Sequence, residues 1–482
     1  MNYMKKILII FIVILILFSA CGGNNGSSNE TKSTPDTTTA IETEEIRENL
    51  PNINFDDYEF KILMEELHPS YTPEVYVTEM TGERVNDALY MRDRVVEERF
   101  GVKISYVVVT GEGQGTTRAY NAIAAGENAF DVMKVTPRSA QKIYGKNFTA
   151  DWQEIPWIDL DKPWWNQNIR DQLSIGGRVT WMSSNASILD YATIRALVFN
   201  KGLFTDMGLD SPYPLVSNGT WTMSAMERYM KDMPQDLNGD GVINVDEDRY
   251  GIIIAGGVID EITFTWGSRI ISKDEDDLPY LVLYSNRTID IVAKLYEWIY
   301  DREYVFARSN WSDRPTWFKS FGENRTLFMF DGLGQLILLR DSDVDFGILP
   351  FPKWDESQEK YMNNAHRASP QFAIPATAPK LERTGIIFEA MSAEGYRMVI
   401  PEYYEIALKV RDTRDNESEK SIDLLYEGLV YDIAEFFNIS FSNLITNLVL
   451  NEKSNYFVSY YEKHETAALA ALDKFVDLVL EE

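Results

Sequence analysis

Acidic and amide side chains alternate along one short stretch of the chain, residues 236–247. Side-chain oxygens occur at every second position at its start, and more follow near its end. This spacing matches the twelve-residue EF-hand loop, in which carboxylate, amide and backbone oxygens surround a Ca²⁺ ion. An Asx-rich turn without metal is the alternative. The predicted ligands are Asp236, Asn238, Asp240, the Val242 carbonyl, Asn244 and Glu247.

Gly241 stands where an EF-hand loop turns sharply. The sequence contains one loop of this pattern, so the cooperative loop pair of a calcium sensor is not available. We therefore expect a structural Ca²⁺ that stabilises its surroundings.

Tryptophan is the second chemical signal, with 11 residues in the chain. Sugars present apolar C–H faces rimmed by hydroxyl groups, so flat aromatic platforms flanked by polar side chains favour carbohydrate binding. Trp266, in the loop-like stretch TFTWGSR, is the first candidate, and Trp317 is the second. For each of them, packing in the core is the alternative.

The patterns of common enzymes are missing from the sequence. His68, His366 and His464 are too scattered for a histidine-rich zinc site, and no Gly-x-Ser-x-Gly elbow occurs. The glycine-rich stretch 111–116 follows a predicted strand, but Thr116 replaces the third glycine of a dinucleotide-binding fingerprint. Carboxylate pairs for glycoside hydrolysis cannot be selected from sequence spacing.

Composition bounds the class of protein. The chain has 482 residues, 45% of them hydrophobic, which is enough for about three compact units with buried cores. Lys and Arg number 46 against 75 Asp and Glu, giving a formal net charge of -29. Because this charge repels nucleic acids and anionic lipids, we expect neither as a partner.

The N-terminus predicts an exported, lipid-anchored protein. Residues 1–20 combine two lysines, an apolar run from Ile7 to Phe18 and a small-residue end, as in a signal peptide. The segment LFSAC resembles a bacterial lipobox, so Cys21, the single cysteine, is the predicted lipidation site. Residues 21–52, rich in Gly, Ser, Thr and Asn, predict a flexible linker. The anchor would hold the protein at the outer face of the cytoplasmic membrane.

The body alternates strand and helix patterns. Tyr58–Met64 and Val102–Val109 have strand character, and Val85–Phe100 between them has helical spacing that ends before Gly101. This is a β-α-β unit, and further α/β alternation follows it, so we expect a mostly parallel, doubly wound sheet. Ligands of such sheets bind beyond the carboxyl ends of the strands. The loops at those ends make Glu66 and Arg138 candidate ligand-binding residues.

Other elements are expected along the rest of the chain. Predicted helices are 118–125, 139–145, 201–207, 223–233, 288–300, 401–408, 421–437 and 466–480, and predicted strands are 130–135, 192–200, 250–254, 326–330 and 345–349.

An ordered set of segments resembles one family over most of residues 55–480. Together with the lipobox, these segments resemble bacterial extracellular solute-binding lipoproteins of ABC importers, in the sugar-type family 1 and its long Gram-positive branch. The segments are Gly82–Ile104, Ala124–Met133, Leu160–Asn166, Phe199–Lys201, Asn218–Thr222, Asp248–Gly251 and Phe346–Lys353.

The resemblance implies a two-lobed α/β fold of the periplasmic-binding-protein type II kind, closing on ligand like a flytrap. We expect one lobe from residues 53–190 and 322–395, and a second from 191–321 and 396–482 with the calcium loop. Such a protein would be a monomer that captures an extracellular carbohydrate, with an oligosaccharide as the expected ligand. It would deliver this ligand unchanged to ABC permease subunits. A surface sensor or adhesin with the same fold, and an exported polysaccharide-active enzyme, are the alternatives.

Overall fold

The computed structural model describes residues 46–66, 76–145, 147–255, 258–308, 314–339, 342–367, 369–403, 416–439 and 441–480. The chain divides into two compact units, Met1–Asn49 and Leu50–Glu482, and every element below belongs to the second. The predicted signal peptide, Cys21, His68 and most of the predicted linker lie outside the described residues. Within the described part of the chain, no helix is long and apolar enough to cross a membrane.

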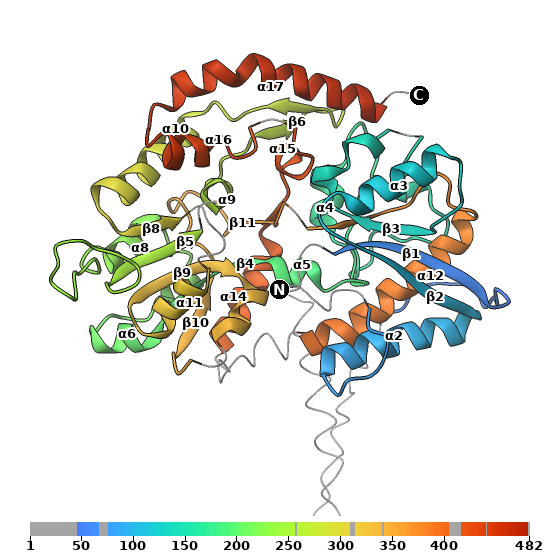
Figure 1. The fold of residues 1–482 in the computed structure, drawn as a ribbon, viewed down its shortest axis with the longest axis horizontal. Helices are drawn as coiled ribbons and strands as arrows, with labels where there is room; N and C mark the ends of the chain where they lie inside the picture. The colour runs from blue at the N-terminus through green and yellow to red at the C-terminus, as the bar shows by residue number, and fades with distance from the viewer. Residues whose placement is uncertain are drawn as a thin grey trace, which may run out of the picture. The chain divides into compact units, whose positions relative to one another are not determined.

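The first sheet has four strands in the order β12-β3-β1-β2 (Figure 1). β1 runs parallel to both β2 and β3, and β12 pairs antiparallel with β3. The predicted, mostly parallel, doubly wound sheet is therefore confirmed. The strands are β1 (Tyr58–Glu66), β2 (Val102–Thr110), β3 (Val132–Val135) and β12 (Gln371–Ala373).

Helix α2 (Arg84–Phe100) connects β1 to β2 and buries Leu89, Val96 and Phe100. It ends where the sequence predicts, because Gly101 adopts a left-handed φ of 57° and its N–H bonds the Glu97 carbonyl. A side chain at Gly101 would also collide with Asn54. Helix α2 packs against α12 (Leu381–Glu394), so the two cover one face of the first sheet together.

The predicted helix at 139–145 is wrong. Two separate 3₁₀ turns, η2 (Pro137–Ser139) and η3 (Gln141–Ile143), stand there instead. Ala140 separates them at φ -93° and ψ 14°, which is not helical, so the i→i+4 ladder of an α-helix cannot form. The other helical elements near the first sheet are α3 (Gln114–Ala124), η4 (Trp152–Glu154), α4 (Gln167–Leu173), α12 (Leu381–Glu394) and η8 (Gly395–Val399).

The second sheet has five strands in the order β10-β4-β9-β5-β8. β4 is antiparallel to both of its neighbours, whereas β5 is parallel to β9 and β8. The strands are β4 (Arg195–Asn200), β5 (Tyr250–Ala255), β8 (Val305–Arg308), β9 (Thr326–Gly332) and β10 (Phe346–Leu349). Around them lie α5 (Leu189–Thr193), α6 (Lys201–Asp206), α7 (Tyr213–Ser217), α8 (Met223–Met230), α9 (Val258–Thr265), α10 (Asn286–Tyr296), η5 (Glu297–Asp301), α11 (Arg314–Gly322), η7 (Leu333–Leu339) and α14 (Asn416–Glu427).

Sheet pairing places the boundary between the lobes differently from the expected division. That division assigned residues 322–395 to the first lobe, but β9 and β10 pair with β4 and β5 in the second sheet. Of the strands in this stretch, only β12 joins the first sheet. The chain therefore crosses back to the first lobe between β10 and β12.

The predicted helix at 421–437 is interrupted. α14 ends at Glu427, and Gly428 packs so closely on the Tyr361 carbonyl that any side chain there would collide with it. Short elements follow, and β11 pairs in parallel with β13. They are β11 (Asn363–Asn364), β13 (Leu429–Val430), α15 (Ile433–Phe436), α16 (Leu444–Thr446) and η9 (Asn447–Asn451).

Helix α17 (Phe457–Leu480) begins at Phe457 rather than at the predicted Thr466. Near its start, Tyr461 packs on Tyr284, which precedes α10. Near its end, Phe475 packs on Tyr144 beside the first sheet. This helix, red in Figure 1, therefore contacts elements of both lobes. A hairpin of β6 (Ile271–Lys273) and β7 (Pro279–Leu281) lies beside it.

Candidate ligand-binding site

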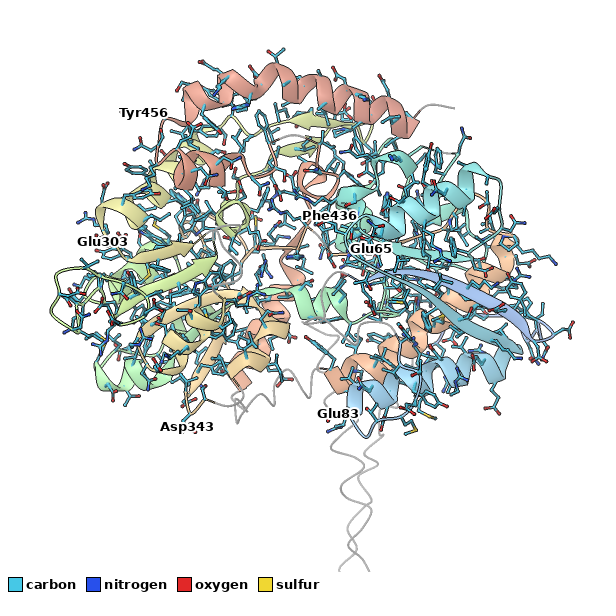
Figure 2. The ribbon with its side chains drawn as sticks, viewed as in Figure 1. Glu65, Glu83, Glu303, Asp343, Phe436 and Tyr456 are labelled. Atoms are coloured by element: carbon cyan, nitrogen blue, oxygen red, sulfur yellow. The ribbon has the colours of Figure 1, made fainter. Side chains whose placement is uncertain are left out.

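Glu65 fixes the carboxyl ends of two strands of the first sheet. Its side chain is 0% exposed at the end of β1, labelled in Figure 2. Its carboxylate accepts hydrogen bonds from the Gly115 N–H at 2.8 Å and from the Thr136 hydroxyl at 2.6 Å. A Cβ at Gly115 would lie 2.9 Å from Glu65, so this approach requires glycine. The carboxylate thus ties β1, the start of α3 and the end of β3 together.

The predicted ligand residue Glu66 lies next to this anchor and is partly exposed. After burial, its charge is the second cause that raises the pKa of Tyr76. The sequence pattern selected Glu66, whereas the carboxylate that organises the strand ends is Glu65.

Arg138 lies in η2, directly beyond the carboxyl end of β3. Its Nη1 donates to the Ser442 hydroxyl at 3.3 Å, and Nη1 of Arg367 donates to the same oxygen at 3.3 Å. Arg367 also donates to Glu435 at 3.1 Å. Burial, and then the nearby Arg367 charge, lower the pKa of Arg138. The structure thus brings predicted residue Arg138 together with residues about 230 to 300 positions further along the chain.

A buried ion-pair network occupies the carboxyl edge of the second sheet. Arg195 at the start of β4 donates to Glu261 at 2.7 Å and to Asp331 at 3.0 Å. Arg314 donates to Asp331 at 3.0 Å and to the side-chain Oε1 of Gln335 at 3.1 Å. Removing one partner from such a network would leave a buried charge uncompensated, so the ion pairs of this network depend on one another.

The pKa values of His366 and Asp260 are shifted by burial and by the charged residues described above. Burial lowers the pKa of His366 well below its usual range, and the charges of Arg195, Arg367, Arg314 and Arg138 lower it further. Burial, and then the charge of Glu435, raise the pKa of Asp260 to about 7. The charges of all four arginines therefore act on His366 and favour its neutral form.

Sequence reasoning missed most of this site. Only Arg138 was singled out, because it follows a strand of the predicted first sheet. Arg195 and Asp331 carry the same kind of signal, since both lie at strand ends of the second sheet. No local pattern marks Arg367 and Ser442, which lie in connecting segments, or Glu435, which lies in the four-residue helix α15.

Both predicted tryptophan platforms lie in the core. Trp266 is 0% exposed and Trp317 is 2% exposed. The Trp266 ring is enclosed by other aromatic rings, with centroids 5.3 Å away for Trp354 and 5.4 Å away for Trp298. Neither indole presents a face to a ligand in this conformation, and both occupy the core position that was the alternative to a sugar platform.

Trp164 and Trp165 point their indole N–H groups at one buried carboxyl group. Glu389 on α12 accepts from Trp164 Nε1 at 3.0 Å and from Trp165 Nε1 at 2.9 Å. Burial raises the pKa of Glu389 to about 8, although the two indole hydrogen bonds favour the carboxylate. The tryptophan pair therefore anchors α12 in the first lobe.

The predicted calcium loop is folded around its own polar side chains. Asp236 accepts from the backbone N–H groups of Gly239 at 2.6 Å and Gly241 at 2.7 Å, and these contacts lower its pKa, that of Gly241 most. The Asn238 amide donates to Asp240 at 3.2 Å and to Glu247 at 2.9 Å. Asn244 also donates to Glu247 at 3.2 Å.

Four of the predicted ligand side chains, Asn238, Asp240, Asn244 and Glu247, are therefore linked by hydrogen bonds, and oxygens of these types are the donors that Ca²⁺ prefers. In the described part of the chain, however, no three His, Cys, Asp or Glu side chains are arranged to hold a metal ion. The amide groups of Asn238 and Asn244 both donate to the Glu247 carboxylate, so in this conformation that carboxylate is occupied by hydrogen bonds within the loop.

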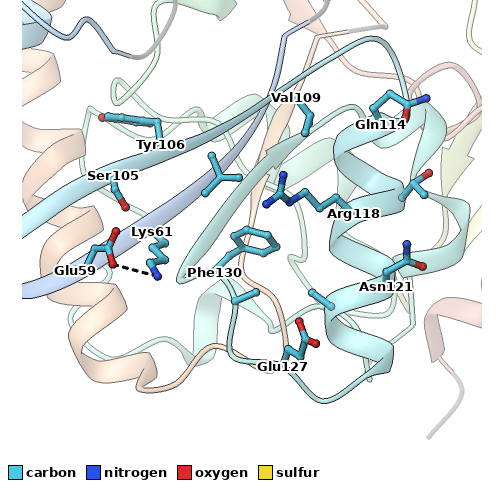
Figure 3. Close-up of a pocket in the computed structure, with 14 residues that line it drawn as sticks. Glu59, Lys61, Ser105, Tyr106, Val109, Gln114, Arg118, Asn121, Glu127 and Phe130 are labelled. Carbon is cyan, nitrogen blue, oxygen red and sulfur yellow. Dashed lines mark ion pairs between the residues drawn. The ribbon is translucent and has the colours of Figure 1, made fainter.

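A cavity of about 840 Å³ lies between β2 and α3, on the outside of the first sheet (Figure 3). Its lining mixes apolar groups with polar ones, including the 3.1 Å ion pair of Lys61 with Glu59. Arg118 extends over the Phe130 ring, 5.9 Å from its centroid. None of the predicted ligand residues lines this cavity, so it is separate from the site at the strand ends.

No protein-family model matches the chain, and no curated protein matches its sequence. Several solved structures share its fold. An ABC substrate-binding protein of Listeria monocytogenes in complex with cycloalternan is 12% identical, with a TM-score of 0.54 over 87% of this chain and 98% of that one. A cyclo/maltodextrin-binding protein complexed with maltotetraose is 12% identical, with a TM-score of 0.56 over 89% and 100%.

The GacH receptor of Streptomyces glaucescens, solved unliganded and with acarbose, is 13% identical, with a TM-score of 0.51 over 88% and 99%. The match covers nearly the full length of all three proteins, and identities this low establish the fold alone. The predicted fold class is confirmed: the chain has the two-lobed α/β fold of solute-binding proteins, and its two sheets are the cores of the two lobes.

Proposed function

We propose that this protein captures an extracellular oligosaccharide and delivers it to the membrane subunits of an ABC importer. The observation that carries the proposal is the shared fold: the three similar structures are of proteins described as binding cycloalternan, maltotetraose and acarbose. Each matches this chain over at least 87% of its length, so both lobes take part in the likeness.

The polar groups at the strand ends support this assignment. Arg138 and Ser442 supply donors and acceptors beside the first sheet, and Arg314 with Gln335 does so beside the second. A ligand between the lobes would contact both sets, and such contacts favour the closed form in proportion to its higher affinity. The crossover after β10 would act as part of the hinge.

The ligand would be released chemically unchanged. Glycoside hydrolysis requires a carboxylic acid to protonate the leaving group and a second carboxylate to act as base or nucleophile. Glu261 and Asp331 are instead held by Arg195 in buried ion pairs. Asp260, whose pKa is raised, accepts from the Ile445 N–H at 3.0 Å, which directs it into the protein. These contacts favour a binding protein over an exported enzyme.

Cys21 would anchor the protein at the outer face of the cytoplasmic membrane. Its acyl chains would bury many methylene groups at about 0.8 kcal/mol each. We expect the mature protein to partition into detergent and the Cys21→Ser variant to remain aqueous. Recovery of the wild type as a soluble protein with unmodified residue 21 would rule the anchor out.

The loop at 236–247 would hold a structural Ca²⁺ through Asp236, Asn238, Asp240, the Val242 carbonyl, Asn244 and Glu247. Bound there, the ion would neutralise carboxylates that are close together. Its effect would be on the stability of the second lobe, because the loop leads directly into β5.

Calorimetric titration of the mature protein tests the binding function. The panel comprises maltotetraose, cycloalternan, acarbose, cellotetraose, mannotetraose and uronate oligosaccharides. We expect one-to-one binding of at least one sugar, with the recovered sugar unchanged in mass. Absence of binding across the panel contradicts carbohydrate capture, and a cleaved sugar indicates an enzyme. Uptake of the bound sugar by cells, lost on deletion of the gene, separates an importer from a sensor or adhesin.

A further inference from the structure

The four arginines of the site differ in how completely their charges are neutralised. Arg195, Arg314 and Arg367 each have a carboxylate oxygen within 3.1 Å. Arg138 has instead one ion pair among the described residues, at 3.9 Å from Glu112, whose side chain is 48% exposed. A long, exposed pair of this kind contributes little. Arg138 is therefore the arginine of the site with the weakest counter-charge.

The position of Arg138 beside Arg367 adds to this excess of positive charge. Both guanidinium groups donate to the Ser442 hydroxyl, so they are held against each other despite their like charge. Glu435 pairs with Arg367 at 3.1 Å, and its charge also acts on Arg138, although less than that of Arg367. Burial, and then the charge of Arg367, disfavour the charged form of Arg138 and lower its pKa.

The backbone around Ser442 is held in an unfavourable conformation. Phe441 and Asn443, on either side of it, have left-handed φ values of 63° and 67°. Left-handed backbone is costly for a bulky residue such as phenylalanine, and residues held in this way concentrate at ligand sites. Ser442, which accepts from both arginines, therefore stands between two residues in left-handed conformation.

Arg138 remains accessible to a ligand. Its side chain is 20% exposed, and it stands at the carboxyl edge of β3, where ligands of α/β sheets bind. A guanidinium group presents a planar fork that matches the two oxygens of a carboxylate. One Nη1 hydrogen is taken by Ser442, and no described residue accepts from Nη2.

We propose that Arg138, supported by Arg367 and Ser442, is a carboxylate-binding subsite, and that the ligand is an acidic oligosaccharide containing a uronate residue. This inference rests on the proposed carbohydrate function and specifies its substrate class. The formal net charge of -29 opposes acidic ligands in general, but physiological salt screens the more distant of these charges beyond about 8 Å. Direct pairing with Arg138 then decides the affinity.

Three pairs of probes test the proposal by calorimetry: tetragalacturonate, tetramannuronate and a glucuronate-bearing xylotetraose, each beside its carboxyl-reduced neutral counterpart. We expect wild-type protein to bind at least one acid 10- to 100-fold more tightly than its counterpart. Arg138→Gln should remove this preference, and Arg138→Lys should keep part of it, because lysine retains the charge but lacks the fork. Arg170→Gln, which alters a half-buried arginine of α4 paired with Asp161 and Asp171, is the control and should leave the preference for acids unchanged.

Each other result separates the inference from the function on which it rests. Binding of neutral sugars as tightly as their acids, or equal weakening of both by Arg138→Gln, overturns the carboxylate subsite and leaves carbohydrate capture standing. Selective binding of acids that survives Arg138→Gln overturns the assignment to Arg138. No binding of these probes or of the neutral panel overturns the proposed function as well. Melting curves of each variant verify that it is folded.

Discussion

Glu389 on α12 is a buried carboxyl group whose surroundings act on its pKa in opposite directions. Removal from water favours the neutral acid, whereas the two indole N–H donors favour the carboxylate. Burial prevails and raises the pKa from 4.5 to about 8. The folded protein consequently holds a proton on Glu389 over a pH range in which the unfolded chain has released it.

This difference predicts how stability depends on pH. Between about pH 4.5 and pH 8 the folded state binds more protons at Glu389 than the unfolded state does. The contribution of Glu389 to the free energy of unfolding is therefore complete below pH 4.5 and is lost as pH rises towards 8. Glu389 changes the free energy of unfolding by at most about 1.4 kcal/mol per pH unit. Glu389→Gln cannot titrate and should flatten the dependence of melting temperature on pH.

Glu382→Gln is the matched control, because Glu382 is exposed on the same helix. Its melting temperatures should follow those of the wild type between pH 5 and pH 8. If Glu389→Gln keeps the wild-type slope, Glu389 is ionised in the folded protein throughout this range.

Elements with strong local patterns were predictable, and elements defined by distant contacts were not. The β1-α2-β2 unit follows from apolar periodicity and a terminating glycine, which depend only on neighbouring residues. The break at Gly428 depends on Tyr361, far away in the sequence, so a continuous helix was the natural expectation. The sequence could not show which of Glu65 and Glu66 organises the strand ends, because a strand buried on both faces lacks a clear alternation of apolar and polar residues.

The candidate site shows the same limit. Proximity to a strand end was enough to select Arg138, but burial of Trp266 depends on rings supplied by η5 and by the chain after β10. Exposure of an aromatic side chain is a property of the tertiary fold, and a local sequence pattern does not encode it. The ion pairs of Arg195 likewise join residues 66 and 136 positions apart.

The calcium loop gives a prediction at the scale of one element. A ligand that binds only the folded state stabilises it by about 2.7 kcal/mol at a concentration one hundred times its Kd. We expect EDTA to lower the melting temperature of the wild type and Asp240→Ala to abolish this effect. Asp246→Asn, which changes a loop acid that is not a predicted ligand, should retain it. Identical wild-type melting curves with Ca²⁺ and with EDTA would contradict the site.

At the scale of the whole molecule, several chain crossings join the two lobes. One crossing lies between β3 and β4, and another lies between β10 and β12. Helix α17 adds contacts to both lobes through Tyr461 and Phe475. Since the candidate residues come from both lobes, rotation about these connections would change the distances between them. This coupling of hinge and site is how a binding protein of this fold converts ligand contacts into a conformational signal.

Native mass spectrometry of the intact mature protein with a mixed library of neutral and uronate oligosaccharides tests the central claim most directly. The account predicts a one-to-one complex whose added mass equals that of an unmodified oligosaccharide, and recovery of the same mass after release. The absence of any oligosaccharide complex, or release of a shortened sugar, would contradict it.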